Sequence, residues 1–430
     1  MASEAPVATT NDFAALLKPD NLSALMRATW TWDDRALRRD LATLLVDLDA
    51  AAGEYMPAGV DPDVLAALRN RALTSGAHFV STVLGPKLLV GTGSDWPPDL
   101  IDAALDPACF ARAADASTAH FHRTGPDYIA THVQAAEHVA EPSWHGLAIS
   151  GSLGLAEAFR AYGYSLSDAA LFGNIGLAWQ ALKATPDSAT AVEYAGRLEQ
   201  GAICAAFAAA EMTGSWDPAL VRTRATQAPG GWRLTGVKNY VPAAGTADIL
   251  FVIARSVAGP SLFAVDPSAQ GVQVDPRAGV DPSRPLFDVA LADTPAELVS
   301  DEGRGGRLMS EVIDLATTAL AAEQVGLIER AINVLTDRSP ADTGALPERV
   351  LEHAAAVSLW RRAVENPSPI TAAAAHIGCS KAAVSAATAV AAHCGPDAQT
   401  DAILRRAISA NLLFGGPAVS HERLLERLGI

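Results

Sequence analysis

Cysteine is scarce and scattered in this chain of 430 residues. The four thiols form no C-x-x-C pair, so neither a disulfide framework nor a zinc site of the usual spacing is expected. A reduced protein of the cytoplasm fits this pattern. The four positions are Cys109, Cys204, Cys379 and Cys394.

Positive charge is also in short supply. Lys and Arg number 32 against 48 Asp and Glu, which gives a formal net charge of −16 at pH 7. Nucleic-acid binding depends on clustered cations that neutralise phosphates, and the sequence shows no such cluster. Nucleic acid is therefore not expected as a partner, although a few local arginines could still grip an anionic ligand.

Long apolar runs and dinucleotide-binding glycines are missing as well. Stretches such as GAICAAFAAA are well short of the ~20 residues that span a bilayer. The start MASEAPVATTND lacks the basic and apolar regions of a signal peptide. No G-x-G-x-x-G follows a strand-like segment, which argues against a Rossmann domain. The sequence predicts a globular protein without a membrane span.

Helical patterns fill both ends of the chain. After a loose tail at 1–12, residues 13–205 predict an N-terminal helical domain, in which WDDRALRRDLATLLVDLDAAA has a capping Asp and apolar residues at helical spacing. Residues 304–430 predict a C-terminal bundle of the four-helix type. Its first helix carries one apolar residue every seven positions, at Ile313, Leu320, Leu327 and Val334.

The period changes to two in the middle of the chain. Between 206 and 303, runs such as WRLTGVKNYV, DILFVIA, SLFAV, GVQV and LFDVAL alternate with Gly- and Pro-containing turns. Short strands at this spacing predict a compact antiparallel barrel or sandwich. The fold class expected is α+β, mostly α, with a middle β domain between two helical ones.

This order of domains resembles the acyl-CoA dehydrogenase family, and specific residues carry the resemblance. AAEMTGSWDPALVRTRATQAPGGWRLTGVKNYVPAAGTADILFVIAR is similar to the family's middle domain, and EGRGG, AAEQVG and RRAISANLLFGGPAVSHERLLERLG extend the similarity. It covers roughly residues 140–430, whereas the first ~130 residues show no match. The resemblance implies FAD as cofactor and an acyl-CoA thioester as substrate, held between the β domain and the bundle. In such enzymes a carboxylate removes the α proton, and flavin accepts the β hydrogen as hydride.

The resemblance also implies cofactor-binding residues. Tyr240 and Val241 match the strand that lies against the flavin ring, with Pro242 where many members have a hydroxyl group. Thr213, Gly214 and Ser215 match a loop that offers N–H and hydroxyl groups to the cofactor. Filling of the β core and an ordinary turn are the alternative interpretations of these two segments.

The C-terminal bundle departs from the family pattern. Where the family has R-x-Q-F-G, which reaches the FAD phosphates of a neighbouring subunit, this chain reads RSPADTG and keeps only Arg338. Asp342 would bring the wrong charge to a pyrophosphate. The family loop H-G-G-x-G reads HCGPD here, which leaves His393 and Gly395 as candidate cofactor contacts. A satisfied helix cap is the alternative role for His393. Arg349 replaces a Gln that touches the cofactor.

No catalytic base stands at either usual family position. These positions read Gly415 and Ala316. Asp314 and Glu323 lie nearby in the sequence and are weak candidates, but a helix turns ~100° per residue, so neither need share the face of Ala316. For Glu323, a helix-packing or ion-pair role is expected rather than a catalytic one. Arg406, one of the pair Arg405–Arg406, is a candidate contact for a CoA phosphate or a subunit interface, with a solvated helix face as the alternative.

The sequence therefore predicts one subunit of an FAD-dependent acyl-CoA dehydrogenase that lacks its own base. Its expected partner is a homologous subunit in an α₂β₂ assembly, with each FAD shared between unlike chains. A bulky thioester such as a sterol side chain, in fatty acid or steroid degradation, is the expected substrate. A flavin-dependent oxygenase of the same fold and a non-catalytic scaffold that binds no flavin are the alternatives.

Overall fold

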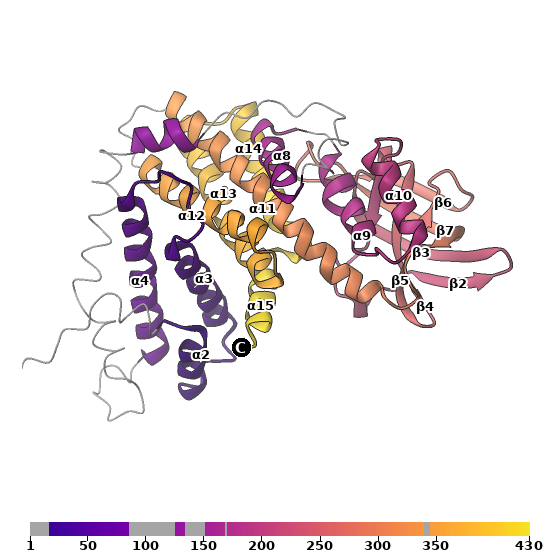
Figure 1. The fold of residues 1–430 in the computed structure, drawn as a ribbon, viewed down its shortest axis with the longest axis horizontal. Coiled ribbons are helices and arrows are strands. Elements are labelled where there is room, and N and C mark those ends of the chain that lie inside the picture. The colour runs from indigo at the N-terminus through magenta and orange to yellow at the C-terminus, as the bar shows by residue number, and fades with distance from the viewer. Residues whose placement is uncertain (1–16, 86–124, 134–150, 168–169, 339–344) are drawn as a thin grey trace, which may run out of the picture.

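The computed structural model describes residues 17–85, 125–133, 151–167, 170–338 and 345–430. A helical bundle and a β domain lie at opposite ends of the molecule, and the long helix α11 runs from one to the other (Figure 1). The predicted α+β class, mostly helical with a β domain in the middle of the chain, is confirmed. The expected tail at 1–12 lies outside the described residues, as does much of the predicted N-terminal domain.

Helices make up both ends of the described chain. A helical segment at 125–132 and a π-helix, η2 (Phe172–Trp179), join the α-helices. The α-helices are α2 (Pro19–Ala28), α3 (Arg35–Ala52), α4 (Pro62–Leu84), α8 (Gly151–Ser165), α9 (Gln180–Lys183), α10 (Ala189–Glu199), α11 (Gly305–Arg338), α12 (Ala345–Glu365), α13 (Pro369–Cys394), α14 (Ala398–Leu412) and α15 (Gly416–Leu428). Three-residue 3₁₀ turns are η3 (Pro218–Leu220), η4 (Ala244–Thr246) and η5 (Leu413–Gly415).

Side-chain caps fix where several helices begin. Asp34 accepts hydrogen bonds from the backbone N–H groups of Ala36 and Leu37 at 2.8 and 3.2 Å, which confirms the predicted capping Asp of α3. Ser368 and Asp397 form capping boxes at the starts of α13 and α14. Each cap satisfies N–H groups that the first helical turn would leave unpaired.

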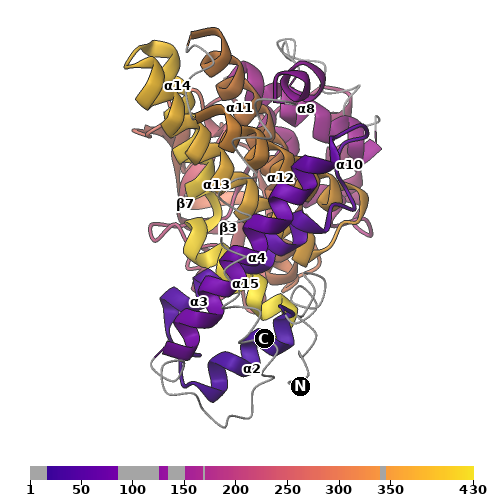
Figure 2. The same ribbon diagram turned by 90° about the vertical axis from the view of Figure 1, so that its left-hand side faces the viewer.

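Helix α11 forms the centre of the bundle. Its seven-residue apolar stripe, Ile313, Leu320, Leu327 and Val334, is buried as predicted. The helix packs against α8, α12 and α13, while α15 lies against α3 and α13 (Figure 2). The last helix of the chain is thereby joined to its first described helices. None of the described helices is long and apolar enough to cross a membrane.

Seven strands form the β domain. They are β1 (Ala205–Ala208), β2 (Arg224–Ala228), β3 (Gly231–Pro242), β4 (Ile249–Ser256), β5 (Gly259–Val265), β6 (Val272–Arg277) and β7 (Leu286–Leu298). The pairings β4–β2–β3–β7–β5–β4 close into a ring, with β1 added to β4 and β6 to β7. The five predicted strands are confirmed as β3 to β7. Apolar side chains, such as Leu234, Phe263 and Val289, fill the ring.

One segment contradicts the predicted pattern. The pattern of ATAVEYAGRLEQGAICAAFAAA predicts a helix that runs on to residue 210, yet α10 ends at Glu199 and residues 205–208 form strand β1. Gly201, at φ 65°, turns the chain there. β1 then pairs in parallel with β4, and the Asn174 side chain accepts a hydrogen bond from the Ala205 N–H. Tertiary pairing therefore overrides the helical preference of alanine.

Two glycines allow α8 and α11 to cross closely. A Cβ atom on Gly163 would overlap the backbone carbonyl of Glu323, and one on Gly326 would overlap the carbonyl of Arg160. Because both obstacles are backbone atoms, no side-chain rotation could relieve the contact. The crossing brings α8 close to the helix on which Glu323 lies.

We expect Gly163→Ala or Gly326→Ala to destabilise the protein by about 1–3 kcal/mol, the usual cost of overpacking. Gly196→Ala is the matched control, because it is also helical but its Cβ would meet nothing within 4 Å. That variant should be neutral or slightly stabilising. Chemical denaturation measures all three. Equal stability of the Gly163 and Gly196 variants would contradict the close crossing.

Candidate functional site

A cleft of about 420 Å³ opens where the β domain meets the bundle. Its walls come from η2, the segment after β1, the end of β3, the β6–β7 connection and the junction between α14 and α15. Apolar and aromatic side chains dominate them. The lining includes Phe172, Leu177, Ala210, Thr213, Gly214, Trp216, Tyr240, Pro242, Arg277, Val280, Leu286, Leu412, Leu413, Phe414 and Gly415.

A bulge in β3 turns Tyr240 into the cleft. The pairing of β3 with β7 shifts register between Lys238 and Val241, and Tyr240 adopts φ 58°, a strained value for an aromatic residue. Its hydroxyl donates to the Met212 carbonyl at 3.3 Å. The guanidinium of Arg277 lies 4.3 Å from the Tyr240 ring centre. The bulge therefore presents an aromatic face backed by a fixed cation.

A buried ion pair anchors the segment that carries Thr213 and Gly214. The Lys238 ammonium, fully enclosed, donates to Glu211 at 2.9 Å and to the Ala209 carbonyl at 3.0 Å. Burial lowers the pKa of Lys238 to about 8, against the opposing effect of Glu211. Glu211 also accepts hydrogen bonds from the backbone of Arg222 and Thr223. These contacts hold the 209–214 segment against β3 at the cleft wall.

The α14–α15 junction closes the cleft with an unusual backbone. Phe414, Gly415 and Gly416 all have left-handed φ, at 60°, 99° and 73°. Phe414 packs edge-on against Trp216, with ring centres 4.9 Å apart, and near Phe172 at 6.3 Å. Periodicity in the sequence could not reveal this aromatic cluster, because its members come from three distant segments in non-repeating conformations.

No acidic residue is among the described residues that line the cleft. Gly415 lies in the wall, and Ala316 is fully buried. Asp314 pairs with Arg427 at 2.6 Å and with Arg423 at 3.3 Å. Glu323 is enclosed in a separate ion cluster. Neither acid occupies the cleft.

The predicted cofactor residues of the β domain divide between two places. Thr213, Gly214 and Tyr240 line the cleft. Val241 points the other way and packs in the β core at 1% exposure. Ser215 is not part of the lining; its hydroxyl accepts from the Asp217 N–H at 3.1 Å and shapes the turn before η3. The structure thus brings three of the five residues together.

The predicted cofactor residues of the bundle lie elsewhere. Arg338 pairs with Asp397 at 2.6 Å and donates to the Cys394 carbonyl. Gly395 ends α13, and His393 lines a separate open pocket with Arg349. This group surrounds the start of α14, whereas the cleft uses its end, ~20 Å away for a helix of this length. Asp342 lies outside the described residues.

Arg406 belongs to a buried cluster of four charges, which includes Asp281, Arg284 and Glu323. None of the four is more than 4% exposed. Arg406 pairs with Asp281 at 3.0 Å and with Glu323 at 3.1 Å, and Glu323 also binds Arg284. The Arg406 side chain is enclosed by protein. It is therefore neither on a solvated helix face nor accessible to a CoA phosphate. Arg405 is the exposed member of the pair and binds Asp401 at 2.6 Å.

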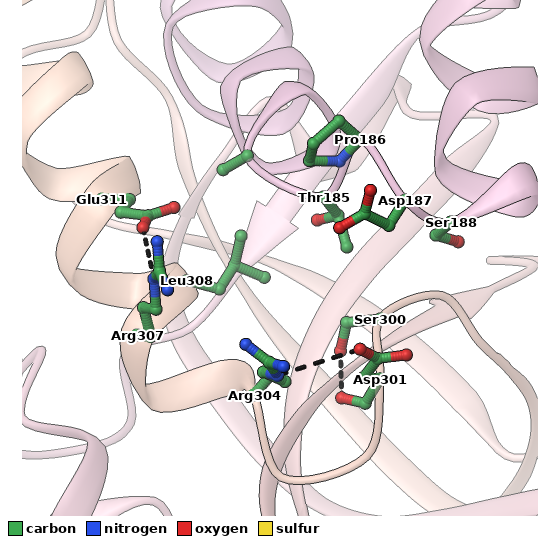
Figure 3. A pocket seen from close by; sticks show the side chains of 11 residues that line it. Thr185, Pro186, Asp187, Ser188, Ser300, Asp301, Arg304, Arg307, Leu308 and Glu311 are labelled. Atoms are coloured by element: carbon green, nitrogen blue, oxygen red, sulfur yellow. Dashed lines mark hydrogen bonds and ion pairs between the residues drawn. The ribbon is translucent and has the colours of Figure 1, made fainter.

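A polar pocket of about 190 Å³ lies at the starts of α10 and α11 (Figure 3). Its two cations each face an acid: Arg304 is 3.8 Å from Asp301, and Arg307 is 2.7 Å from Glu311. None of the predicted site residues contributes to it. Among the described residues, no cluster of His, Cys, Asp and Glu could hold a metal ion.

Comparisons with known proteins agree with this architecture. Residues 206–286 match the acyl-CoA dehydrogenase middle domain. Butyryl-CoA dehydrogenase from Megasphaera elsdenii is similar, with 15% identity, a TM-score of 0.61 and coverage of 91% of this chain and 98% of that chain. The ChsE4-ChsE5 complex from Mycobacterium tuberculosis gives 18% identity, a TM-score of 0.56 and coverage of 84% and 97%. A structure of PigA with FAD and proline has 19% sequence identity and a TM-score of 0.59, and the match covers 65% of this chain and 82% of that chain. No curated protein matches the sequence.

The chain therefore has the acyl-CoA dehydrogenase fold, as the resemblance predicted. More particularly, residues 206–286 of its β domain match the acyl-CoA dehydrogenase middle domain, and the cleft lies where the β domain meets the helical bundle.

We expect Arg406→Met to destabilise the protein by about 3–5 kcal/mol, because it leaves buried acids without their partner. Arg405→Met, one residue away on the exposed face, should leave stability nearly unchanged, because exposed ion pairs contribute little. Chemical denaturation of both variants provides the measurement. If Arg406→Met folds as stably as Arg405→Met, Arg406 is not the structural ion-pair residue described here.

Proposed function

We propose that this chain is a subunit of an FAD-dependent acyl-CoA dehydrogenase and that its cleft holds the flavin ring. The observation that supports this most directly is the cleft itself, a cavity lined by aromatic and apolar side chains beside a β domain that matches the acyl-CoA dehydrogenase middle domain. When bound, FAD supplies the hydride acceptor for α,β-dehydrogenation.

The residues of the cleft fit such a ring. Tyr240 and Trp216 offer aromatic surface, and Gly214 leaves room beside Tyr240, where an added Cβ would come within 3.7 Å of its ring. Thr213 provides a hydroxyl group. Arg277, held by Asp288 at 2.7 Å, provides a cation for an anionic group of the ligand. Small-molecule sites commonly combine apolar walls with a few such polar groups.

A base is the part that this cleft lacks. Removal of the α proton needs a carboxylate within hydrogen-bond reach of it, and the described lining offers none. We propose that a homologous subunit completes the site, within an α₂β₂ assembly. The group at Arg338, His393 and Gly395 would then serve an FAD of the partner subunit, since it lies far from the chain's own cleft.

The proposed substrate is a CoA thioester with a bulky apolar acyl group, such as a sterol side chain. Leu286, Leu412, Leu413 and Phe414 give the cleft apolar walls for such a group. These side chains would exclude water around the thioester, which strengthens polar contacts to its carbonyl.

The test compares the chain loaded with FAD alone and the chain co-purified with a homologous subunit. Each is mixed anaerobically with acyl-CoA, and bleaching of the flavin absorbance is followed. We expect bleaching by the complex to be at least ~100-fold faster than by the chain alone, the low end of what a general base contributes. Bleaching by the chain alone at the rate of the complex would contradict the proposal.

One variant and two further outcomes distinguish the proposal from its alternatives. Asp314→Asn in this chain should leave bleaching by the complex unchanged; its loss with flavin retained would make Asp314 the base. A colourless complex whose partner is equally active alone would indicate a scaffold. A flavin-loaded chain that reacts with oxygen and substrate but does not dehydrogenate thioesters would indicate the oxygenase.

A further inference from the structure

A second cavity, of about 450 Å³, lies on the bundle side of the α14–α15 junction. We call it the rear cavity. Leu412 to Gly415 line the cleft, whereas the flanking residues Asn411 and Pro417 line the rear cavity. Its other walls are α3 and one side of α13. Its volume falls in the range of small-molecule sites, and apolar atoms form most of its surface.

His376 is the polar group at the wall of the rear cavity that lacks a full set of partners. Its side chain is 98% enclosed, at 2% exposure. Nδ1 lies 3.4 Å from the Ser380 hydroxyl, which accepts from the Gln324 amide at 2.8 Å. Among the described residues, Nε2 has no hydrogen-bond partner. Because His376 lines the rear cavity, a ligand or a water molecule there can hydrogen-bond to this nitrogen.

One tautomer of His376 gives every proton of this chain of contacts an acceptor. The Gln324 amide donates to Ser380, the Ser380 hydroxyl donates to Nδ1, and Nε2 then carries the ring N–H. Burial lowers the pKa of His376 to about 4, and Arg423 and His421 act in the same direction. The ring is therefore a neutral donor at physiological pH.

The second histidine of the rear cavity differs in this respect. His421 uses both ring nitrogens, Nε2 with the Thr43 hydroxyl at 3.1 Å and Nδ1 with the Pro417 carbonyl. It is therefore part of the wall. A cationic ligand is disfavoured, because Lys381 lines the same cavity. The site thus combines mostly apolar walls with a few polar side chains, among them the His376 ring, the Asn411 amide and the Lys381 ammonium.

We propose that the rear cavity binds a small, neutral, mainly apolar molecule whose single oxygen, of an alcohol or a ketone, accepts a hydrogen bond from His376 Nε2. This inference does not rest on the proposed dehydrogenase activity. It concerns a separate cavity, and its test needs neither flavin nor thioester.

The experiment titrates the full chain with 1-hexanol and follows the methyl signals of Ile377 and Val384 by NMR. We expect a saturable shift of both. Because a net hydrogen bond contributes ~0.5–1.5 kcal/mol, n-hexane should bind about threefold to tenfold more weakly. His376→Phe should weaken 1-hexanol binding by the same factor. No saturable shift, or equal binding of both probes, would overturn the proposal.

A matched pair of variants on the partly exposed side of α13 guards against misfolding of the His376 variant. Val384→Phe places a ring in the rear cavity and should abolish the hexanol shift at Ile377. Thr388 lies one turn further along and lines a different pocket, so Thr388→Phe should retain the hexanol shift at Ile377. An unchanged shift in Val384→Phe, or a crystal structure in which only ordered water occupies the cavity at high hexanol concentration, would contradict the assignment.

Discussion

The structure depends on the buried cluster of Asp281, Arg284, Glu323 and Arg406. These residues come from the β6–β7 connection, α11 and α14, so the cluster fastens the β domain to the bundle. Removing four charges from water is costly unless they are paired well, and here two cations meet two anions. Arg284 also lies over Phe172 and Arg406 over Tyr162, at 4.9 and 5.0 Å from the ring centres. The cleft exists because this junction is held at a fixed geometry.

Ion pairs hold the two candidate acids, Asp314 and Glu323, outside the cleft. Glu323 is committed to two arginines, and Asp314 to two others on α15. Two of the six non-glycine residues with left-handed φ in the described part of the chain, Tyr240 and Phe414, line the cleft. Non-glycine residues in this region are uncommon and persist where the surrounding structure enforces them. The wall therefore contains strained backbone at these two positions, and its described lining includes no carboxylate.

Much of the fold could be predicted from the sequence, because it depends on local signals. The seven-residue stripe of α11, the capping Asp34 and the period-two strands each reflect backbone geometry over a short window. Strand β1 could not be predicted, since alanine favours helix and only pairing with β4 decides otherwise. The site was predicted less well. Tyr240, Thr213 and Gly214 line the cleft, whereas their neighbours Val241 and Ser215 are not part of its lining. The identical residues Arg405 and Arg406 have opposite environments, which only the rotation of α14 determines.

We propose that the cleft holds a flavin but does not remove the α proton of a thioester. Exchange of that proton tests it most directly. The chain alone, loaded with FAD, is incubated with acyl-CoA in D₂O, and deuterium at the α carbon is measured by mass spectrometry. We expect deuterium to enter the α carbon no faster than it does in buffer without the protein. Enzyme-dependent exchange would show that this chain carries its own base and would contradict the account.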